Sequence, residues 1–366
     1  MTPERATFGL AQASRRWWLV LCVLVGASVF AYRGRNPGAL PADTRFGGPA
    51  QGTTYSVVLP GTRSPDAVAA LQAAVDSVIA GIDTVMSTYD PSSELSRLNR
   101  DARTAPIAVS PALANVLQIA AQVSRDSRGA FDVTVAPLIN AWGFGPDGDV
   151  TSAPDSATLS ALRERVGWQR LAVSDGSVTK MSPLVEVDLN AIAPGYTVDR
   201  IVDLLIARGE PAHLVELGGE LRASGRNARG LPFRVGIEEP DSSRRAVRLV
   251  VGLQDRALAT SGNYRDFRDV NGVRYVHTLD PSTGRPVTHR LLAVSVLHAQ
   301  CAFADAWATA LLVVGPERAW ALAEEHDLDV LLLIAGASGK VEQRLTPGFA
   351  SAVLPNDTGA RTKESR

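Results

Sequence analysis

The chain has 366 residues, which allows two average domains or one large one. Lysine and arginine total 37 against 38 aspartate and glutamate, and this formal net charge of −1 excludes a protein that sheathes nucleic acid, which needs a clustered excess of cations. Hydrophobic residues make up 45% of the chain and charged residues 20%, which indicates a globular protein with a sizeable core and excludes a broadly disordered one.

The N-terminal segment carries the pattern of an export signal. Arg15 and Arg16 precede an apolar run over residues 17–32, and a basic stretch followed by an apolar one is typical of signal peptides. Cleavage after Ala31 and retention as an uncleaved anchor both fit this run. We therefore predict that residues 1–32 are a signal peptide or membrane anchor. The rest of the chain is then extracytoplasmic, on the periplasmic side, exported or anchored to the inner membrane.

The remainder of the chain is predicted to form one domain. Residues 33–50 are rich in Gly, Pro and Ala and predict a linker, whereas residues 351–366 are polar and predict a frayed tail. No repeat and no Pro-rich gap divides residues 51–350, the predicted catalytic domain. Cys22 and Cys301 are the only cysteines, so this domain can form no internal disulfide and depends on its core and bound ligands for stability.

Hydrophobic periodicity predicts the elements of this domain in chain order. A helix capped by Ser64 or Asp66 is expected to run to about Met86, and further helices are expected over residues 111–127, 156–166, 198–208, 303–314 and 316–325. Strands are expected over residues 53–59, 171–173, 178–181, 184–189, 213–217, 220–224, 233–237, 247–253, 257–260, 273–279, 291–298 and 330–335. Helices mixed with antiparallel-looking strands predict an α+β fold.

One pair of residues on the predicted helix 303–314 suits a metal ion. Asp305 and Thr309 are four residues apart and share a helix face, so a carboxylate and a hydroxyl can reach the same cation. Oxygen ligands suit Mg²⁺, which takes its other ligands from water and substrate phosphate. The pair alone fits equally well a helix-start acid followed by a core-facing threonine.

Two further motifs place a polar residue beside a turn. Asp188 ends the predicted strand 184–189 and precedes a small-residue loop, a junction that can bring a carboxylate to a ligand. His277 lies on the predicted strand 273–279, just before the turn Asp280–Gly284, and histidine is the natural acid or base near neutral pH. An ordinary turn acid and a structural strand histidine would give the same pattern.

Three stretches combine aromatic residues with glycine and hydroxyl groups. They cover residues 51–55, 86–99 and 127–146. Such residues can stack on a planar ring and hydrogen-bond its edge, although loops packed on the core would explain them too. The chain has no Walker loop, no zinc-ligand spacing and no GxSxG motif.

The order of these motifs along the chain is more informative than any one of them. Together they resemble the ApbE family, the FAD:protein FMN transferases. The matching stretches are GTTYSV (52–57), MSTYDPSSELSRLN (86–99), GAFDVTVAPLINAWGFGP (129–146), VDLNAIAPGYTVDRI (187–201), HLVELGGELRASG (213–225), VGIEEP (235–240), ALATSGNYRDF (257–267), VHTLDPSTGRP (276–286) and FADAWATALLVVGPE (303–317). The resemblance covers most of the chain after the N-terminal segment.

The resemblance implies a fold, an activity and a set of site residues. It implies a T-fold-like α+β core that binds FAD and Mg²⁺, and a transferase that moves the FMN half of FAD to a Ser or Thr hydroxyl of an acceptor protein by a phosphoester bond, releasing AMP. Matching positions imply metal binding by Asp305, Thr309 and the Ala191 carbonyl, and catalysis by His277. The positions implied to contact the flavin nucleotide are Gln51, Tyr89, Ala130, Phe131, Asp132, Asp188, Pro194 and Thr278.

Two positions depart from the family's pattern. Gln51 stands where Met is usual, and Pro194 stands where Lys or Glu is frequent. Proline has neither a side-chain charge nor an amide proton, so a polar contact made there by other members is lost.

The implied partner is a flavoprotein subunit of a membrane or exported electron-transport system. Two other functions remain open from the sequence. Water could replace the acceptor, which would make the chain a Mg²⁺-dependent FAD pyrophosphatase that yields FMN and AMP. Alternatively, the chain could bind or deliver flavin without catalysis.

Overall fold

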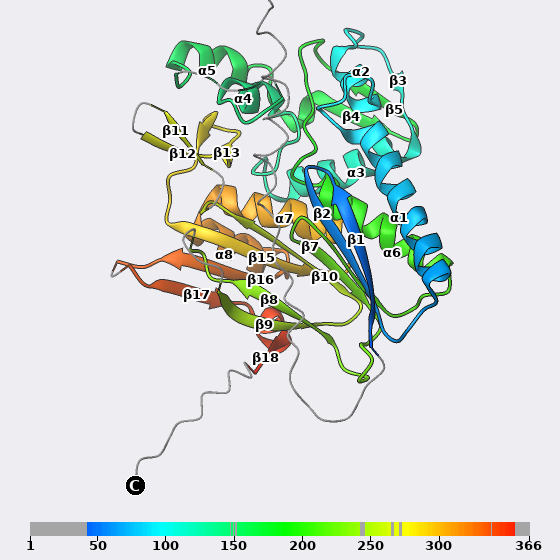
Figure 1. The fold of residues 1–366 in the computed structure, drawn as a ribbon. Helices are drawn as coiled ribbons and strands as arrows, with labels where there is room; N and C mark the ends of the chain where they lie inside the picture. The colour runs from blue at the N-terminus through cyan, green and yellow to red at the C-terminus, as the bar shows by residue number, and fades with distance from the viewer. Residues whose placement is uncertain are drawn as a thin grey trace, which may run out of the picture.

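The computed structural model describes residues 42–355 except residues 147, 149, 151, 242–245, 265–266, 271–272 and 338 (Figure 1). The predicted signal or anchor over residues 1–32 lies outside the described residues. The helices are α1 (Pro65–Met86), α2 (Glu94–Arg100), α3 (Pro111–Asp126), α4 (Ala136–Ala141), α5 (Ser156–Arg163), α6 (Ala193–Ala207), α7 (Cys301–Val314), α8 (Pro316–Glu325) and α9 (Pro347–Ala352), with a 3-10 turn at Trp168–Arg170.

The main element is an antiparallel sheet with the strand order β1-β2-β6-β7-β10-β15-β16-β17. Its strands are β1 (Thr44–Ala50), β2 (Thr53–Leu59), β6 (His213–Leu217), β7 (Glu220–Ser224), β10 (Arg256–Gly262), β15 (Leu291–His298), β16 (Asp329–Ala335) and β17 (Val341–Leu345). Smaller sheets contain β3 (Ile107–Ala108), β4 (Leu171–Ser174) and β5 (Ser177–Lys180), or β8 (Phe233–Glu238), β9 (Val247–Leu253) and β18 (Val353–Leu354). Two hairpins pair β11 (Phe267–Val270) with β12 (Val273–Val276), and β13 (Leu279–Asp280) with β14 (Arg285–Pro286).

Both faces of the main sheet are buried, and the strand sequences show why. In β10, Ala257 and Ala259 pack into the large core with the helices, whereas Leu258 between them packs into a second core on the other face. Successive strand residues point to opposite faces, so a strand covered on both sides is apolar throughout. Helices α1, α3, α6 and α7 cover one face, and the sheet β18-β9-β8 with α9 covers the other (Figure 1).

Local signals explain the longer helices. The hydroxyl of Ser64 accepts a hydrogen bond from the Ala67 N–H and Pro65 begins α1, which is a strong helix start. The buried residues of α1 then recur every three or four positions and form one face. Within the described residues, only α1 is long and apolar enough for a membrane span, and its buried face packs on the core.

The structure corrects the predicted linker, tail and one strand. Residues 44–50 are not linker but strand β1, because the turn at Gln51 and Gly52, with φ of 48° and 77°, closes a hairpin with β2. Residues 351–354 are not frayed, since they complete α9 and form β18 against β9. The predicted strand 184–189 is not a strand in the described residues, because Leu184 lies in a turn and residues 185–189 belong to no sheet.

Helix boundaries near the site also differ from the predictions. Helix α6 begins at Ala193 rather than at residue 198, and α7 begins at Cys301 rather than at residue 303. His277 follows strand β12 instead of lying within a strand. Partners distant in sequence support both helix starts, since Asp199 accepts from the first two N–H groups of α7 and Asp305 accepts from the Gly195 N–H of α6.

The packing of α6 on α7 leaves no room for a side chain at Gly195. A Cβ there would lie 2.6 Å from the Cys301 carbonyl oxygen and 2.8 Å from the Asp305 Cβ. Gly81 of α1 offers the opposite case, because a Cβ there would meet nothing within 4 Å. Alanine substitutions at the two glycines therefore distinguish the effect of close packing on stability from the effect of helix propensity.

We expect Gly195→Ala to lower the free energy of unfolding by about 1–3 kcal/mol because the helices must move apart. Gly81→Ala should raise the free energy of unfolding by about 0.5–1 kcal/mol, since alanine has a higher helix propensity than glycine at an exposed helix position. Urea unfolding of both variants measures this. Equal stabilisation by the two substitutions would contradict the close contact between α6 and α7.

Candidate active site

The N-terminus of α7 is closed by a carboxylate from α6. Asp199 Oδ1 accepts hydrogen bonds from the Cys301 N–H at 2.9 Å and from Arg222 Nη1 at 2.6 Å, and its Oδ2 accepts from the Ala302 N–H at 3.0 Å. The N-cap residue of α7, Gln300, makes no side-chain cap. Asp199 therefore satisfies N–H groups that the helix leaves open and places its charge at the positive end of the helix dipole.

A second carboxylate joins the same helices one turn further along. The Gly195 N–H donates to Asp305 Oδ2 at 3.0 Å, and Asp305 is only 5% exposed. Because this N–H turns to Asp305, it does not continue the helical ladder back to residue 191. Within the described chain, no backbone amide donates to the Ala191 carbonyl, which leaves that oxygen available.

Asp305 belongs to a group of buried acids. Burial raises the pKa of Asp305 above its usual range, and the Asp199 carboxylate nearby raises it further. Burial and the charge of Asp305 raise the pKa of Glu220 well above its usual range. Burial also raises the pKa of Glu216 to about 7, although Glu216 accepts hydrogen bonds from the Gly219 N–H and Ser56 Oγ.

The hydroxyl of Thr309 faces the end of strand β10. Thr309 Oγ1 and Ser261 Oγ lie 3.1 Å apart. Two residues beyond Ser261, Asn263 Oδ1 accepts a hydrogen bond of 2.6 Å from Thr278 Oγ1. The end of β10 therefore brings the predicted metal ligand Thr309 and the predicted flavin contact Thr278 to one region.

These groups have the chemistry that a hard divalent cation requires. Asp305, Thr309 and the Ala191 carbonyl supply oxygen atoms. Burial penalises the ionised forms of Asp305 and Glu220, and a cation would offset that penalty. The Arg222 guanidinium is already paired with Asp199. Among the described residues, no group of three or more His, Cys, Asp or Glu side chains is placed to hold a metal, so such a cation would complete its shell with water and substrate oxygens.

Sequence reasoning missed Ser261, Glu216 and Glu220. Glu216 and Glu220 flank two glycines, and the spacing of the two acids around a strand turn was the available signal. The approach of Glu220 to Asp305 comes from tertiary structure, because Glu220 belongs to strand β7 while Asp305 belongs to α7.

The predicted flavin contacts fall into two connected groups. Gln51 lies in the β1–β2 turn, and its Nε2 donates to Asp83 Oδ1 at 3.2 Å and to Thr197 Oγ1 at 2.9 Å. Thr197 belongs to α6, the helix whose first turn contains Pro194. In the second group, the Asp188 N–H donates to the Val133 carbonyl at 2.7 Å, which joins Asp188 to the loop that carries Ala130, Phe131 and Asp132.

The acids of the second group are buried. Asp132 accepts hydrogen bonds from the Thr134 N–H and from the Trp168 N–H, and burial raises its pKa. Burial raises the pKa of Asp188 to about 6, against the opposing effect of the Asn190 N–H. Both carboxylates thus lie inside the protein, where a polar ligand group can meet them without competition from bulk water.

Two predicted site residues lie nearer the surface. Tyr89 is 64% exposed in the turn between α1 and α2. His277 lies in the bend after β12, with its ring centroid 6.5 Å from that of Phe144 in an edge-on arrangement. His277 directly precedes the buried Thr278, so the chain carries it to the edge of the region that contains Thr309.

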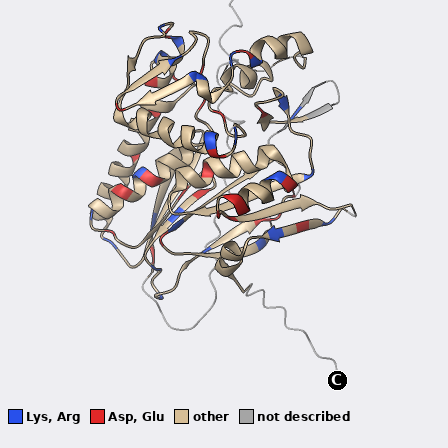
Figure 2. Ribbon diagram, turned by 180° about the vertical axis from the view of Figure 1, so that it is seen from behind, with Lys and Arg blue, Asp and Glu red and all other residues tan. Residues whose placement is uncertain are grey.

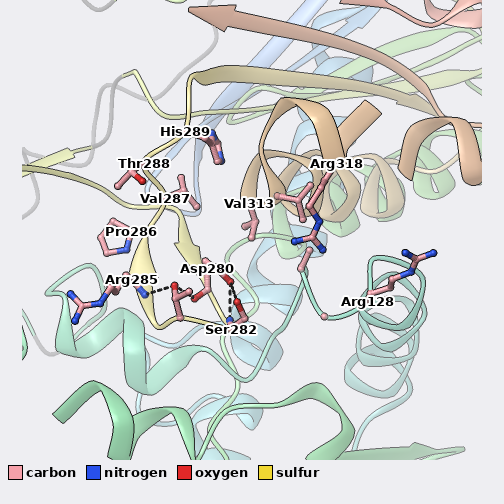
Figure 3. A pocket seen from close by; sticks show the side chains of 14 residues that line it. Arg128, Asp280, Ser282, Arg285, Pro286, Val287, Thr288, His289, Val313 and Arg318 are labelled. Atoms are coloured by element: carbon pink, nitrogen blue, oxygen red, sulfur yellow. Dashed lines mark hydrogen bonds between the residues drawn. The ribbon is translucent and has the colours of Figure 1, made fainter. Parts of the chain in front are cut away.

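A cavity of about 440 Å³ lies beside this region, between the β13–β14 hairpin and the end of α7 (Figure 3). Asp280 Oδ1 accepts hydrogen bonds from Ser282 N and Oγ at its rim. Of the predicted flavin contacts, only Ala130 lines this cavity. The cavity therefore adjoins the predicted site without containing its acids.

The described charges show no dominant cationic surface. Figure 2 shows basic and acidic residues interspersed along the same helices and strands. An anionic substrate would therefore have to be met by local groups rather than by a broad positive field.

Comparison with known proteins identifies the class of enzyme. The chain is 39% identical over 303 residues to the FAD:protein FMN transferase of Vibrio cholerae serotype O1, covering 82% of this chain and 90% of that one. It is 34% identical over 311 residues to the FAD:protein FMN transferase of Escherichia coli strain K12, covering 84% and 88%. The predicted enzyme class, a transferase, is confirmed.

Solved structures and a family model define the family. The flavin transferase ApbE from Vibrio cholerae matches with a TM-score of 0.78 and 36% identity, covering 85% of this chain and 99% of that one. The apo form of the Pseudomonas stutzeri flavinyl transferase ApbE also matches with a TM-score of 0.78 at 36% identity, covering 86% and 98%. The model of the ApbE family matches residues 51–332. The chain belongs to the ApbE family, and the predicted α+β fold of that family is confirmed.

The buried Glu216 gives the region a measurable pH dependence. Its pKa is about 7 in the folded protein against 4.5 ordinarily, so folding favours the protonated acid. Stability is then lost as the pH rises from about 4.5 to 7. We expect Glu216→Gln to be more stable than the wild type by about 1–3 kcal/mol at pH 8 and nearly equal to it at pH 4.5.

Urea unfolding at the two pH values measures this difference. Glu342→Gln, on the exposed part of β17, is the control and should change little at either pH. A gain for Glu216→Gln of the same size at pH 4.5 and pH 8 would show that ionisation of Glu216 is not its cause.

Proposed function

We propose that this protein transfers the FMN half of FAD to a Ser or Thr hydroxyl of an acceptor protein, with Mg²⁺ bound, and releases AMP. The observation that carries the proposal is the buried Asp305 carboxylate, which joins α6 to α7 one helical turn before Thr309 and to which no basic side chain of the described residues is bonded. The family's curated members named above are FAD:protein FMN transferases. FAD is a substrate here, and flavin remains on the acceptor.

Asp305, Thr309 and the Ala191 carbonyl would hold the metal ion. When bound, Mg²⁺ neutralises charge on the FAD pyrophosphate as bonds to phosphorus change. The Gly195 N–H holds Oδ2 of Asp305. The close packing of α6 on α7 therefore also fixes the direction of the other carboxylate oxygen, Oδ1. Asp199 supports the same geometry from the start of α7.

The flavin nucleotide would lie across both groups of predicted contacts. Gln51, Tyr89 and Pro194 would form one side, and Ala130, Phe131, Asp132, Asp188 and Thr278 the other. The Gln51 amide is held by Asp83 and Thr197, so a polar group occupies this position in one fixed orientation. We propose that this held amide replaces the packing that a methionine would supply.

His277 would handle the proton of the reaction. The acceptor hydroxyl oxygen forms a bond to the phosphorus of the FMN half, and the bond from that phosphorus to the AMP oxygen breaks with its electron pair. His277 takes the hydroxyl proton or passes a proton to the departing AMP. The edge-on Phe144 ring restricts the orientation of His277 on one side.

The place of action follows from the N-terminal pattern. With residues 1–32 as a signal peptide or membrane anchor, the enzyme would work on the periplasmic side, free or held at the inner membrane. Its acceptor would be a flavoprotein subunit of a membrane or exported electron-transport system.

One incubation separates this function from its alternatives. The purified protein is mixed with FAD, MgCl₂ and an exported flavoprotein subunit from the same genome. Fluorescent flavin that stays on the subunit after denaturation supports transfer. Free FMN and AMP without label would mean hydrolysis, and unchanged bound FAD would mean a carrier.

We expect His277→Ala to slow flavin transfer by about 10²–10⁴-fold while FAD binding changes little, because the loss is of proton transfer. Single-turnover label formation and flavin fluorescence titration measure the two quantities. His298→Gln, at the end of β15, is the matched control and should retain the wild-type rate. Near wild-type transfer by His277→Ala with Mg²⁺ present would refute the role given to His277.

A further inference from the structure

The segment that carries Asp188 obtains its backbone hydrogen bonds from outside any sheet. Residues 185–189 form no regular secondary structure, and no strand of the described chain pairs with them. A largely buried segment of this kind must satisfy its N–H and C=O groups elsewhere, because an unpaired backbone group inside a protein is costly. Here a side chain on α2 supplies part of this pairing.

Asn99 of α2 pairs with Val187 in both directions. Asn99 Nδ2 donates to the Val187 carbonyl at 2.9 Å, and the Val187 N–H donates to Asn99 Oδ1 at 2.8 Å. The next N–H, that of Asp188, donates to the Val133 carbonyl at 2.7 Å. The peptide group between Val187 and Asp188 is therefore held at its oxygen by Asn99 and at its nitrogen by Val133.

Asn99 is itself fixed by a buried lysine. Lys180 is 0% exposed, and its Nζ donates to the carbonyls of Leu98 at 3.1 Å, Asn99 at 3.2 Å and Pro183 at 3.5 Å. Two of these carbonyls belong to the last turn of α2, where a cation interacts favourably with the helix dipole. Lys180 thus ties the end of α2 to the turn that precedes residues 185–189.

This network serves no part of the chemistry described above, yet it joins segments from three parts of the predicted flavin site. Asn99 lies in the last turn of the helix that follows the Tyr89 turn, Val133 follows Asp132, and Val187 precedes Asp188. Simple core packing would not require an amide that matches both backbone groups, N–H and C=O, of one residue. The arrangement instead fixes the backbone on either side of a buried acid.

We propose that Asn99, supported by Lys180, is a positioning residue that presents Asp188 to the flavin nucleotide. We name the pair Asn99 and Lys180 the Asn99 latch. The inference rests on the proposed function, because it takes Asp188 as a contact of FAD. The latch holds the Val187–Asp188 peptide and so places the backbone of Asp188, while the Asn190 N–H and Nδ2, which donate to the two carboxylate oxygens, hold the side chain on that backbone.

The test is FAD affinity in a double-mutant cycle of Asn99→Asp and Asp188→Asn. Asn99→Asp keeps the acceptor for the Val187 N–H and loses the donor to the Val187 carbonyl. We expect it to weaken FAD binding about tenfold, the effect of roughly one hydrogen bond to a positioned group, with kcat at saturating FAD within about threefold of the wild type. In the Asp188→Asn background, the same change should weaken binding less than about twofold.

Asn227→Asp is the matched control. Asn227 also pairs with backbone at both ends of its amide, since its Nδ2 donates to the Pro232 carbonyl at 2.9 Å and its Oδ1 accepts from the Arg229 N–H at 2.9 Å. Asn227 lies in the loop that connects β7 to β8, far from Asp188 in the sequence. It should lower the thermal midpoint about as much as Asn99→Asp and leave FAD affinity unchanged.

The outcomes separate the latch from the function on which it rests. The latch is supported if the wild type binds FAD and Asn99→Asp weakens that binding about tenfold only when Asp188 is present. Wild-type binding with no loss in Asn99→Asp, or an equal loss with and without Asp188, overturns the latch and leaves the proposed function standing. Absence of FAD binding by the wild type overturns both. If Asn99→Asp does not fold, Lys180→Met removes the support from the other side and must give the same Asp188-dependent loss.

Discussion

Two carboxylates buried between α6 and α7 fix the arrangement on which the rest of the site depends. Asp199 closes the start of α7, and Asp305 receives the Gly195 N–H one helical turn later. Gly195 has no space for a side chain, so the helices approach closely enough for both bonds. A shift of one helix would break the cap and the Asp305 contact together, which makes this contact rigid.

The same contact explains how a nearly neutral chain can act on an anionic substrate. The acids around Asp305 are buried, and burial raises their pKa values because it penalises the ionised form. A bound cation would stabilise the ionised acids, so metal binding would favour loss of their protons, and loss of the protons would favour metal binding. The proposed transferase would therefore meet the pyrophosphate with a metal held at one point rather than with a positive surface.

Much of the fold could be predicted because its signals are local. The Ser64 cap and the periodic apolar face predict α1, and helix α8 begins and ends where its pattern does. Strand β1 was missed because its Gly and Pro content resembles a linker, and its pairing depends on the turn at Gln51. Residues 184–189 have the apolar pattern of a strand, but Asn99 occupies the place of a neighbouring strand.

The site was harder to predict than the fold. Asp305 and Thr309 could be proposed from helical spacing, whereas Glu220 and Ser261 approach them only through tertiary structure. The roles of Asp188 and His277 came from the resemblance to the family and remain predictions. Spacing along a chain identifies partners on one element, and it carries little information on partners from different elements.

We propose that Asp305, held by α6, binds the metal on which flavin transfer depends. Calorimetric titration of MgCl₂ into the FAD-loaded wild type and the Asp305→Asn variant measures this binding. We expect saturable binding by the wild type and affinity at least about tenfold weaker in Asp305→Asn, because the amide carries no charge. Equal Mg²⁺ affinity in the two proteins, with FAD still bound to both, would contradict the account.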